Sequence, residues 1–283
     1  MAGRLYLVGT PIGNLEDMTF RAVETLRAVD LIAAEDTRHT GKLLLHFGIG
    51  TPQISYHEHN RMARTPELIT HLQRGTNIAL VTDAGMPAIS DPGQELVRAC
   101  LDAELPVIPI PGGTAGITAL VASGMATERF VFEGFLPSEP NKGRDRLQQL
   151  IQESRTLIFY EAPHRLLATL ERFAEAFSGD RPITVARELT KRHEEFWRGT
   201  LREAIAHFSA RPPKGEFTLV LAGKPPDPKP QWNDAQLRIA LLELMQQQGM
   251  SRSQASRSLA DLTALPHRRL YQLSLDLPVD HIG

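Results

Sequence analysis

The sequence predicts an α/β fold with two domains, the first built on a parallel sheet and the second on a mixed sheet, followed by a small helical module. Three observations predict it. Short apolar runs alternate with helical patterns over residues 1–120 of the 283-residue chain. Farther on, two strand-like runs at 183–187 and 195–200 are separated by only seven residues, too few for a crossover helix. A proline-rich stretch at 224–230 then precedes purely helical patterns.

The first domain is predicted over residues 1–120. Its expected strands are 5–8, 31–35, 53–56, 78–82 and 107–110. Helical patterns fall between them, around 19–29, 40–47, 62–74 and 92–103. Because strands and helices alternate, we expect crossover connections and a parallel sheet.

The second domain is predicted over residues 121–224. Its expected strands are 129–135, 156–160, 183–187, 195–200 and 217–222, with helices near 143–153, 164–177 and 201–208. The close pair at 183–187 and 195–200 predicts an antiparallel hairpin, and so a mixed sheet.

Residues 225–231 are predicted to be a stiff proline-rich linker, and residues 232–283 a helical tail. Helical patterns begin near residues 236, 251 and 266. The tail resembles a helix-turn-helix module that could bind RNA phosphates through Arg252, Arg257, Arg268 and Arg269, against one nearby acid, Asp261. Packing of the three helices as a cap on the rest of the chain is the alternative.

The composition, with 42% hydrophobic and 23% charged residues, is that of an ordinary globular protein. No apolar run approaches the ~20 residues of a membrane helix, so we expect no membrane partner. The single cysteine, Cys100, falls on the apolar side of its helical pattern, which favours a core position and a reducing cytoplasm. With a formal net charge of -2, any nucleic acid would have to be attracted by local basic patches.

The stretch from Val81 to Gly93 follows an apolar strand and contains a carboxylate, glycines, prolines and hydroxyl groups. We expect Asp91 to cap the next helix, with Pro92 at its first position. Small ligands bind beyond the carboxyl ends of strands in open α/β sheets, so this stretch is a candidate ligand loop, with a solvated connection as the alternative.

Three other strand ends also carry polar or glycine-rich loops. The loop after the first strand, from Gly9 to Asp17, has glycines four residues apart, which does not match the dinucleotide-binding spacing. Its acids would also repel a pyrophosphate. The loops at 35–40 and 110–116 add acids, hydroxyl groups and three glycines.

Two further patterns do not support a phosphate or metal site. Gly41-Lys42 is followed by leucine rather than by the serine or threonine of a Walker A loop. His57 and His59 have no third ligand nearby, so no metal is expected. The basic loops at 138–146 and 187–193 could instead form a positive rim for a phosphate backbone, through Lys142, Arg144, Arg146 and Arg187.

Several motifs together resemble the bacterial small-subunit ribosomal RNA cytidine 2′-O-methyltransferases, a branch of the tetrapyrrole methylase superfamily. They are Val8-Gly-Thr-Pro-Ile-Gly-Asn-Leu-Glu-Asp17, Ala34-Glu-Asp-Thr-Arg-His-Thr40, Val81-Thr-Asp-Ala-Gly85, Ser90-Asp-Pro-Gly93, Phe132-Glu-Gly-Phe-Leu-Pro137 and Ala186-Arg-Glu-Leu-Thr-Lys191. The resemblance runs from about residue 5 to the C-terminus. It implies a tetrapyrrole-methylase-like fold, a homodimer, S-adenosylmethionine as cofactor, and a cytidine ribose in the decoding region as methyl acceptor. The expected substrate is ribosomal RNA within the assembled small subunit, with free RNA as the alternative.

By matching position, the resemblance implies a set of cofactor-binding residues on both sides of a cleft. They are Asp83, Ala84, Gly85, Ile89, Ser90, Thr114 and Ala115 in the first domain, and Tyr160, Glu161, Glu188 and Glu216 in the second. Met86 and Gly113-Thr114 depart from the usual pattern, which has a small hydroxyl residue at the first position and a proline followed by a small residue at the second.

Methyl transfer to a hydroxyl group needs in-line alignment and a group that accepts the proton. We expect Glu35 or Asp36 to act as the base, with Asn14 and Arg38 orienting the ribose and its phosphate; Lys191 is the rival for the base. A tetrapyrrole C-methyltransferase is the alternative enzyme. A nucleic-acid-binding protein without catalysis is the alternative from another class.

Overall fold

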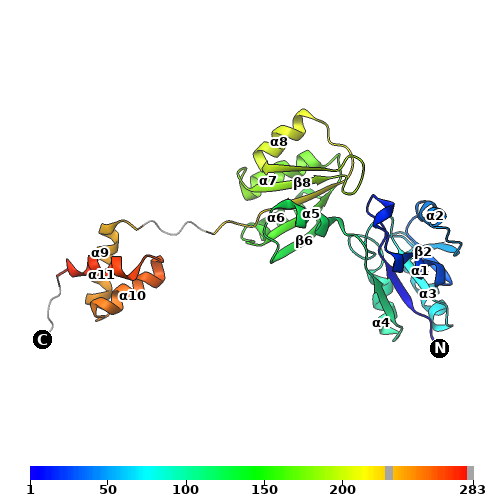
Figure 1. Ribbon diagram of the computed structural model, residues 1–283, viewed down its shortest axis with the longest axis horizontal. Helices are drawn as coiled ribbons and strands as arrows, with labels where there is room; N and C mark the ends of the chain where they lie inside the picture. Colours follow the sequence, from blue (N-terminus) through cyan, green and yellow to red (C-terminus); the bar gives the residue numbers. More distant parts are fainter. Residues whose placement is uncertain (227–231, 279–283) are drawn as a thin grey trace. The chain divides into compact units, whose positions relative to one another are not determined.

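The computed structural model describes residues 1–226 and 232–278, and the chain divides into two compact units, Met1–Pro225 and Pro226–Gly283 (Figure 1). Most of the predicted linker, residues 227–231, lies outside the described residues. The first unit contains two five-stranded sheets, and the described part of the second, residues 232–278, contains three helices.

The first sheet is parallel, as predicted, with strand order β3-β2-β4-β1-β5. Its strands are β1 (Leu5–Val8), β2 (Leu31–Ala34), β3 (Gln53–Ser55), β4 (Ile78–Val81) and β5 (Val107–Ile110). Leu5 of β1 pairs with Ile78 of β4 and with Val107 of β5. This register sets the carboxyl ends of the three strands side by side, so the loops that follow them share one edge of the sheet.

Helices cover the first sheet on both faces, because each crossover returns the chain to a parallel neighbour. They are α1 (Phe20–Ala28), α2 (Thr37–His46), α3 (Arg61–Gln73) and α4 (Gln94–Asp102), with a short 3-10 turn, η1, at Leu15–Asp17. Two apolar clusters fill the space between helices and sheet, and Cys100 is a fully buried member of one of them. The core position predicted for the cysteine is confirmed.

The second sheet is mixed, with strand order β6-β7-β10-β8-β9. Its strands are β6 (Phe130–Phe135), β7 (Thr156–Glu161), β8 (Pro182–Arg187), β9 (Glu195–Thr200) and β10 (Phe217–Leu221). Strands β6 and β7 pair in parallel, while β8 and β9 form the predicted antiparallel hairpin. Helices α6 (Pro140–Leu150), α7 (Leu166–Phe177) and α8 (Leu201–Ala210) follow strands of this sheet.

Helix α5 (Ala115–Ser123) lies between the two sheets in the chain and packs on the second. Its Ala119 and Leu120 are buried with Ile158 of β7 and Val220 of β10. The boundary predicted after residue 120 therefore falls within a helix whose apolar side packs on the second sheet.

The second unit contains α9 (Asp234–Gln247), α10 (Arg252–Thr263) and α11 (His267–Leu275). Asn233 and Ser251 each begin a helix with a capping box, in which the cap side chain and a glutamine three residues later exchange hydrogen bonds with backbone N–H groups. Leu237, Leu241, Leu259 and Leu270 form the centre of this unit. In the part of the chain that the structure describes, no helix combines the length and apolarity that crossing a membrane would require.

Candidate functional site

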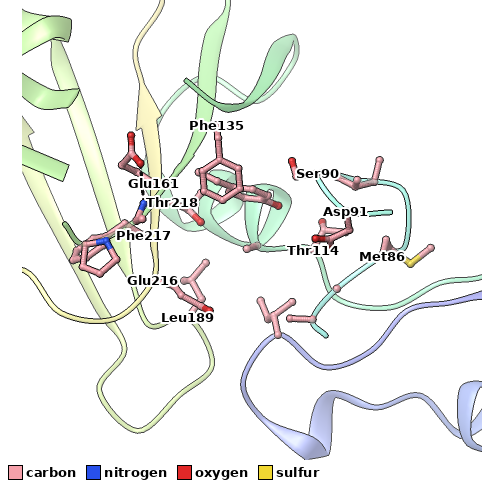
Figure 2. A pocket seen from close by; sticks show the side chains of 18 residues that line it. Met86, Ser90, Asp91, Thr114, Phe135, Glu161, Leu189, Glu216, Phe217 and Thr218 are labelled. Atoms are coloured by element: carbon pink, nitrogen blue, oxygen red, sulfur yellow. Dashed lines mark hydrogen bonds between the residues drawn. The ribbon is translucent and has the colours of Figure 1, made fainter. Parts of the chain in front are cut away.

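A cavity of about 360 Å³ separates the loops at the carboxyl edge of the first sheet from the second sheet. Figure 2 shows Met86, Ser90, Asp91 and Thr114 on one wall, facing Phe135, Glu216 and Leu189 on the other. We refer to it as the cofactor cavity. Nine of the eleven residues predicted to bind the cofactor line it: Ala84, Gly85, Ile89, Ser90, Thr114, Ala115, Tyr160, Glu161 and Glu216.

The other two predicted cofactor residues, Asp83 and Glu188, are not among the residues that line this cavity. Asp83 lines a neighbouring cavity, described below, and its carboxylate accepts a hydrogen bond from the backbone N–H of Asp36. Glu188 accepts hydrogen bonds from Lys191 and from the backbone N–H of Glu216. Both carboxylates therefore hydrogen-bond to neighbouring residues of the site without lining the cofactor cavity.

The first wall depends on close contact between backbone segments. Thr10 and Gly85 form an isolated antiparallel bridge. The distance from the Thr10 nitrogen to the Gly85 carbonyl oxygen is 2.9 Å, and the reciprocal distance is 3.1 Å. A Cβ atom on Gly112 would lie 2.9 Å from the Cα of Gly9, so the loops after β1 and β5 touch where neither residue has a side chain. Met86 packs here too, since a Cβ atom on Gly9 would lie 2.7 Å from its sulfur.

The expected helix cap at Asp91 is wrong. Helix α4 begins at Gln94, with Gly93 as the N-cap residue at a φ of 146°. A Cβ atom on Gly93 would lie 2.9 Å from the Leu80 side chain, so only glycine allows this turn to pack on β4. The turn delays the helix by two residues and leaves the Asp91 carboxylate on the wall of the cofactor cavity.

The second wall is aromatic, with internally paired polar groups. The Tyr160 ring makes edge contacts with Phe132 and Phe135, with centroids 5.1 and 5.7 Å apart. Its hydroxyl accepts a hydrogen bond from the backbone N–H of Gly116, in the first turn of α5, and burial raises the pKa of the phenol. Glu161 is buried.

The Glu161 carboxylate accepts hydrogen bonds from the Thr169 hydroxyl at 2.6 Å and from the backbone N–H of Ala162 at 2.8 Å. It also pairs with Arg165 at 3.3 Å. These contacts hold the carboxylate in one orientation and compensate its burial.

A second cavity, of about 530 Å³, adjoins the first and shares Ile12, Ala84 and Glu216 with it. We refer to it as the acceptor cavity. It is lined by the loop after β1, by α2 and by the loop after β8, and three basic side chains reach it: His39, Lys42 and Lys191. The cofactor cavity, by contrast, has no lysine, arginine or histidine among its lining residues within the described chain.

Of the five predicted catalytic residues, Lys191 lines the acceptor cavity. Its ammonium group donates to Glu188 and Glu216, both at 2.9 Å. Burial opposes the charge, but these hydrogen bonds outweigh it and raise the pKa of Lys191. Lys191 is therefore held as a cation.

Asn14, Glu35, Asp36 and Arg38 lie beside the acceptor cavity in the chain but are not among its lining residues. Asn14 caps η1 by accepting from the backbone N–H of Glu16. Asp36 caps α2 and accepts two hydrogen bonds from the Arg38 guanidinium, which lower the pKa of its carboxyl. Burial raises the pKa of Glu35, whose carboxylate accepts from the backbone N–H of Asp83.

The predicted RNA-binding residues fall into two groups. Arg146 is held by the buried Glu133, Arg187 by Glu195 and the Lys214 carbonyl, Arg252 by the Leu277 carbonyl, and Arg269 by Asp234. Lys142 pairs with Glu139 at the surface. Arg144, Arg257 and Arg268 are exposed. Asp234 and Asp276 thus add acids to the helical unit beyond the one expected from its sequence.

Sequence reasoning missed several lining residues. The sequence predicts a helix cap at Asp91, and Lys42 stands out in it only beside Gly41, in a pattern that does not match a Walker A loop. Phe135 lies in one of the quoted motifs, but nothing in the sequence alone placed it opposite Ser90. His39 belongs to the polar group at the end of the second strand, which the sequence predicts as active-site wall, although it carries no role of its own there. Thr218 carries no signal in the sequence.

Comparison with known proteins identifies the family of the chain. Residues 4–205 match the family described as Tetrapyrrole (Corrin/Porphyrin) Methylases. A relative in Synechocystis sp. named ribosomal RNA small subunit methyltransferase I is 64% identical over 278 residues, which cover 98% of this chain and 99% of the relative. A relative of the same name in Bacillus subtilis is 47% identical, and the match covers 95% of this chain and 93% of the relative.

Solved structures share the fold of the first unit. A cobalt precorrin-4 methyltransferase superposes with a TM-score of 0.59 at 18% identity, covering 78% of this chain and 94% of that one. A uroporphyrin-III C-methyltransferase from Thermus thermophilus, complexed with S-adenosylhomocysteine, has a TM-score of 0.56 at 20% identity, covering 77% and 97%. These likenesses confirm the predicted fold class.

Proposed function

Because the chain belongs to the tetrapyrrole methylases and, within them, to the ribosomal RNA small subunit methyltransferase I family, we propose that it methylates a ribose 2′-hydroxyl of a cytidine in small-subunit ribosomal RNA. S-adenosylmethionine is the methyl donor. The observation that carries the proposal is the pair of joined cavities, one acidic and apolar and the other with three basic side chains beside Asp83 and Glu216. The near full-length relatives favour this activity over a tetrapyrrole C-methyltransferase and over a protein without catalysis.

The cofactor cavity fits S-adenosylmethionine by its chemistry. The cofactor carries a sulfonium cation and no phosphate, and the cavity is lined by carboxylates with no basic side chain among the described residues. Its aromatic and aliphatic wall, with Ile12, Phe135 and Leu189, suits the apolar faces of an adenosine. When bound, the cofactor supplies an activated methyl group. The residues that line the cavity hold that group in place.

The acceptor cavity is suited to a nucleotide. His39 and Lys42 on α2 can contact phosphate oxygens, which position RNA without reading its sequence. Since the two cavities meet at Ile12, Ala84 and Glu216, an acceptor hydroxyl held there would face the cofactor cavity. Alignment of two reactants in this way is a large part of the rate gain in a transfer reaction.

The charges beside the acceptor cavity suggest different roles for the predicted catalytic residues. A base works best when its pKa lies near the working pH. Glu35, with its raised pKa, is better suited to accept the hydroxyl proton than Asp36, whose pKa Arg38 lowers. Glu35 lines a separate cavity beside Asp91 and not the acceptor cavity, so it would take the proton through a bridging water. Lys191, held as a cation, would stabilise the developing oxyanion rather than accept a proton. Asn14 and Arg38 remain proposed to orient the ribose and its phosphate.

Two substitutions at Asp36 separate a capping role from a catalytic one. Asparagine can still cap α2 but carries no charge, whereas alanine removes the cap. We expect Asp36→Asn to retain the melting temperature and most of the turnover, and Asp36→Ala to lower the melting temperature by a few degrees. Turnover is measured with saturating cofactor. Loss of turnover in Asp36→Asn, with an unchanged melting temperature, would instead assign the base to Asp36.

The acceptor is identified by supplying tritiated S-adenosylmethionine with three candidates in parallel. We expect label to enter assembled small subunits or free small-subunit ribosomal RNA, and not a tetrapyrrole such as uroporphyrinogen III. The comparison of subunits with free RNA also decides whether assembly is needed. Label in the tetrapyrrole alone would contradict the proposal. Methylation of subunits would also agree with the cytoplasmic location predicted from composition.

We also propose that the protein is a homodimer. Strand β6 is at the edge of the second sheet, and exposed apolar side chains lie on it and on α5: Phe130, Phe132, Ile117 and Val121. Val121 is 70% exposed, and a second copy would remove this face from water.

We expect sedimentation to report a dimer for the wild type and a monomer for Val121→Glu. Leu101→Glu on α4, also at an exposed apolar site, is the matched control; a monomeric wild type contradicts the proposal.

A further inference from the structure

Asp91 is a half-buried carboxylate that lines two cavities. One is the cofactor cavity, where Figure 2 shows Asp91 beside Thr114 and Met86. The other, of about 390 Å³, is a more open cavity lined by residues at the starts of α3 and α4, and we refer to it as the solvent-side cavity. Burial and the neighbouring Glu35 and Asp83 raise the pKa of the Asp91 carboxyl to about 7. A carboxylate in such a place is destabilised unless a cation reaches it.

The chain itself supplies no free cation to Asp91 within the described residues. From the first sheet, Glu35 and Asp83 face it with like charge. Across the solvent-side cavity, Arg61 pairs with Glu58 and Glu95. Across the cofactor cavity lie Tyr160, Glu161 and Glu216, and the two acids among them are paired with Arg165 and Lys191. Asp91 is thus the lining carboxylate whose counter-charge must come from a ligand.

We propose that Asp91 binds the positively charged end of S-adenosylmethionine and makes cofactor binding release a proton at mildly acidic pH. The proposal rests on the proposed use of this cofactor in the same cavity. The cofactor has two cations, the sulfonium and the α-ammonium, and either can pair with a carboxylate. A cation beside Asp91 favours its ionised form, so an Asp91 that is protonated before binding loses its proton on binding.

The direction of the pH effect follows from this linkage. Above about pH 7 Asp91 is already ionised, so its contribution to cofactor affinity is complete and no longer changes with pH. Below that pH the proton must be displaced, so the affinity falls about tenfold for each further pH unit. S-adenosylhomocysteine keeps the ammonium but lacks the sulfonium charge. If Asp91 pairs with the sulfonium, only the affinity for S-adenosylmethionine depends on pH, and the product is released more readily at high pH than the substrate is.

The test is calorimetric titration of the full-length protein with S-adenosylmethionine and with S-adenosylhomocysteine, between about pH 5.5 and 8.5. Repeating each titration in two buffers of different ionisation enthalpy counts the protons released. For the wild type we expect proton release with S-adenosylmethionine at pH 6 and none at pH 8.5. Asp91→Asn should bind it about tenfold or more weakly at pH 8 and with no proton release.

Two controls make the outcomes distinguishable. Glu58→Gln removes an acid from the solvent-side cavity without touching the cofactor cavity, and should leave binding unchanged. The melting temperature of ligand-free Asp91→Asn at pH 8 should be equal to or above that of the wild type, because repulsion from Glu35 and Asp83 is removed. Equal affinity and proton release in Asp91→Asn and wild type would overturn the inference. Failure of the wild type to bind either ligand would contradict the proposed function instead.

Discussion

Gly112→Ala is expected to destroy most cofactor binding. The new Cβ atom would lie 2.9 Å from the Cα and carbonyl carbon of Gly9, a backbone contact that cannot yield by rotating a side chain. The loops after β1 and β5 must then separate. That movement displaces Thr10, which bridges to Gly85, and Thr114 and Ala115, which line the cofactor cavity. We expect a loss of more than tenfold in affinity for S-adenosylmethionine and about 1–3 kcal/mol in the free energy of unfolding.

The adjacent glycine is the matched control. A Cβ atom on Gly113 would meet only the Ile12 side chain, at 3.9 Å, so Gly113→Ala should fold with nearly the stability of the wild type. Both variants are compared by denaturant unfolding and by cofactor titration. Equal stability of Gly112→Ala and Gly113→Ala would show that the contact between the two loops is not tight in solution.

Lys191→Ala is expected to lower kcat by about 100-fold at saturating cofactor and RNA, the effect of removing one charged group from a developing oxyanion. The Lys191 ammonium lies on the wall of the acceptor cavity and is fixed there by Glu188 and Glu216. Because it does not line the cofactor cavity, the Kd of S-adenosylmethionine should change little. Lys191→Arg keeps the charge and should recover part of the turnover.

Lys142→Ala is the control for this substitution. Like Lys191, Lys142 pairs with a glutamate three residues before it, but it lies on α6 at the surface. The Lys142→Ala substitution should leave kcat unaltered and should change no more than the KM for RNA. A Lys191→Ala variant with wild-type kcat would remove Lys191 from the reaction. A Lys191→Ala variant with both a lower melting temperature and weaker cofactor binding would assign Lys191 a structural role.

The sheets could be predicted from sequence because their signal is local. The buried strand β4 is a continuous apolar run, β10 is interrupted only by Thr218, and the short interval between β8 and β9 allows only a hairpin. Parallel strands bring their carboxyl ends to one edge, which is why the loops after β1, β4 and β5 could be expected to share a site. The resemblance then supplied the facing residues of the second sheet, including Tyr160 and Glu216.

What could not be predicted depends on partners distant in sequence. Asp91-Pro92 has the residue types of a helix start, but the contact of Gly93 with Leu80 delays the helix and exposes Asp91 to the cavity. Arg146 looked available to RNA in the sequence, yet it is held by Glu133 on β6, whose side chain is 5% exposed. Local sequence patterns do not show which charges are already paired.

The measurement that tests the central claim most directly is the position of the methyl group on the RNA. Small-subunit RNA labelled from tritiated S-adenosylmethionine is hydrolysed in alkali, which cleaves a phosphodiester bond only where the preceding ribose has a free 2′-hydroxyl. We predict that the label survives in an alkali-stable dinucleotide that begins with 2′-O-methylcytidine. Recovery of the label in mononucleotides would place the methyl group on a base and contradict the account.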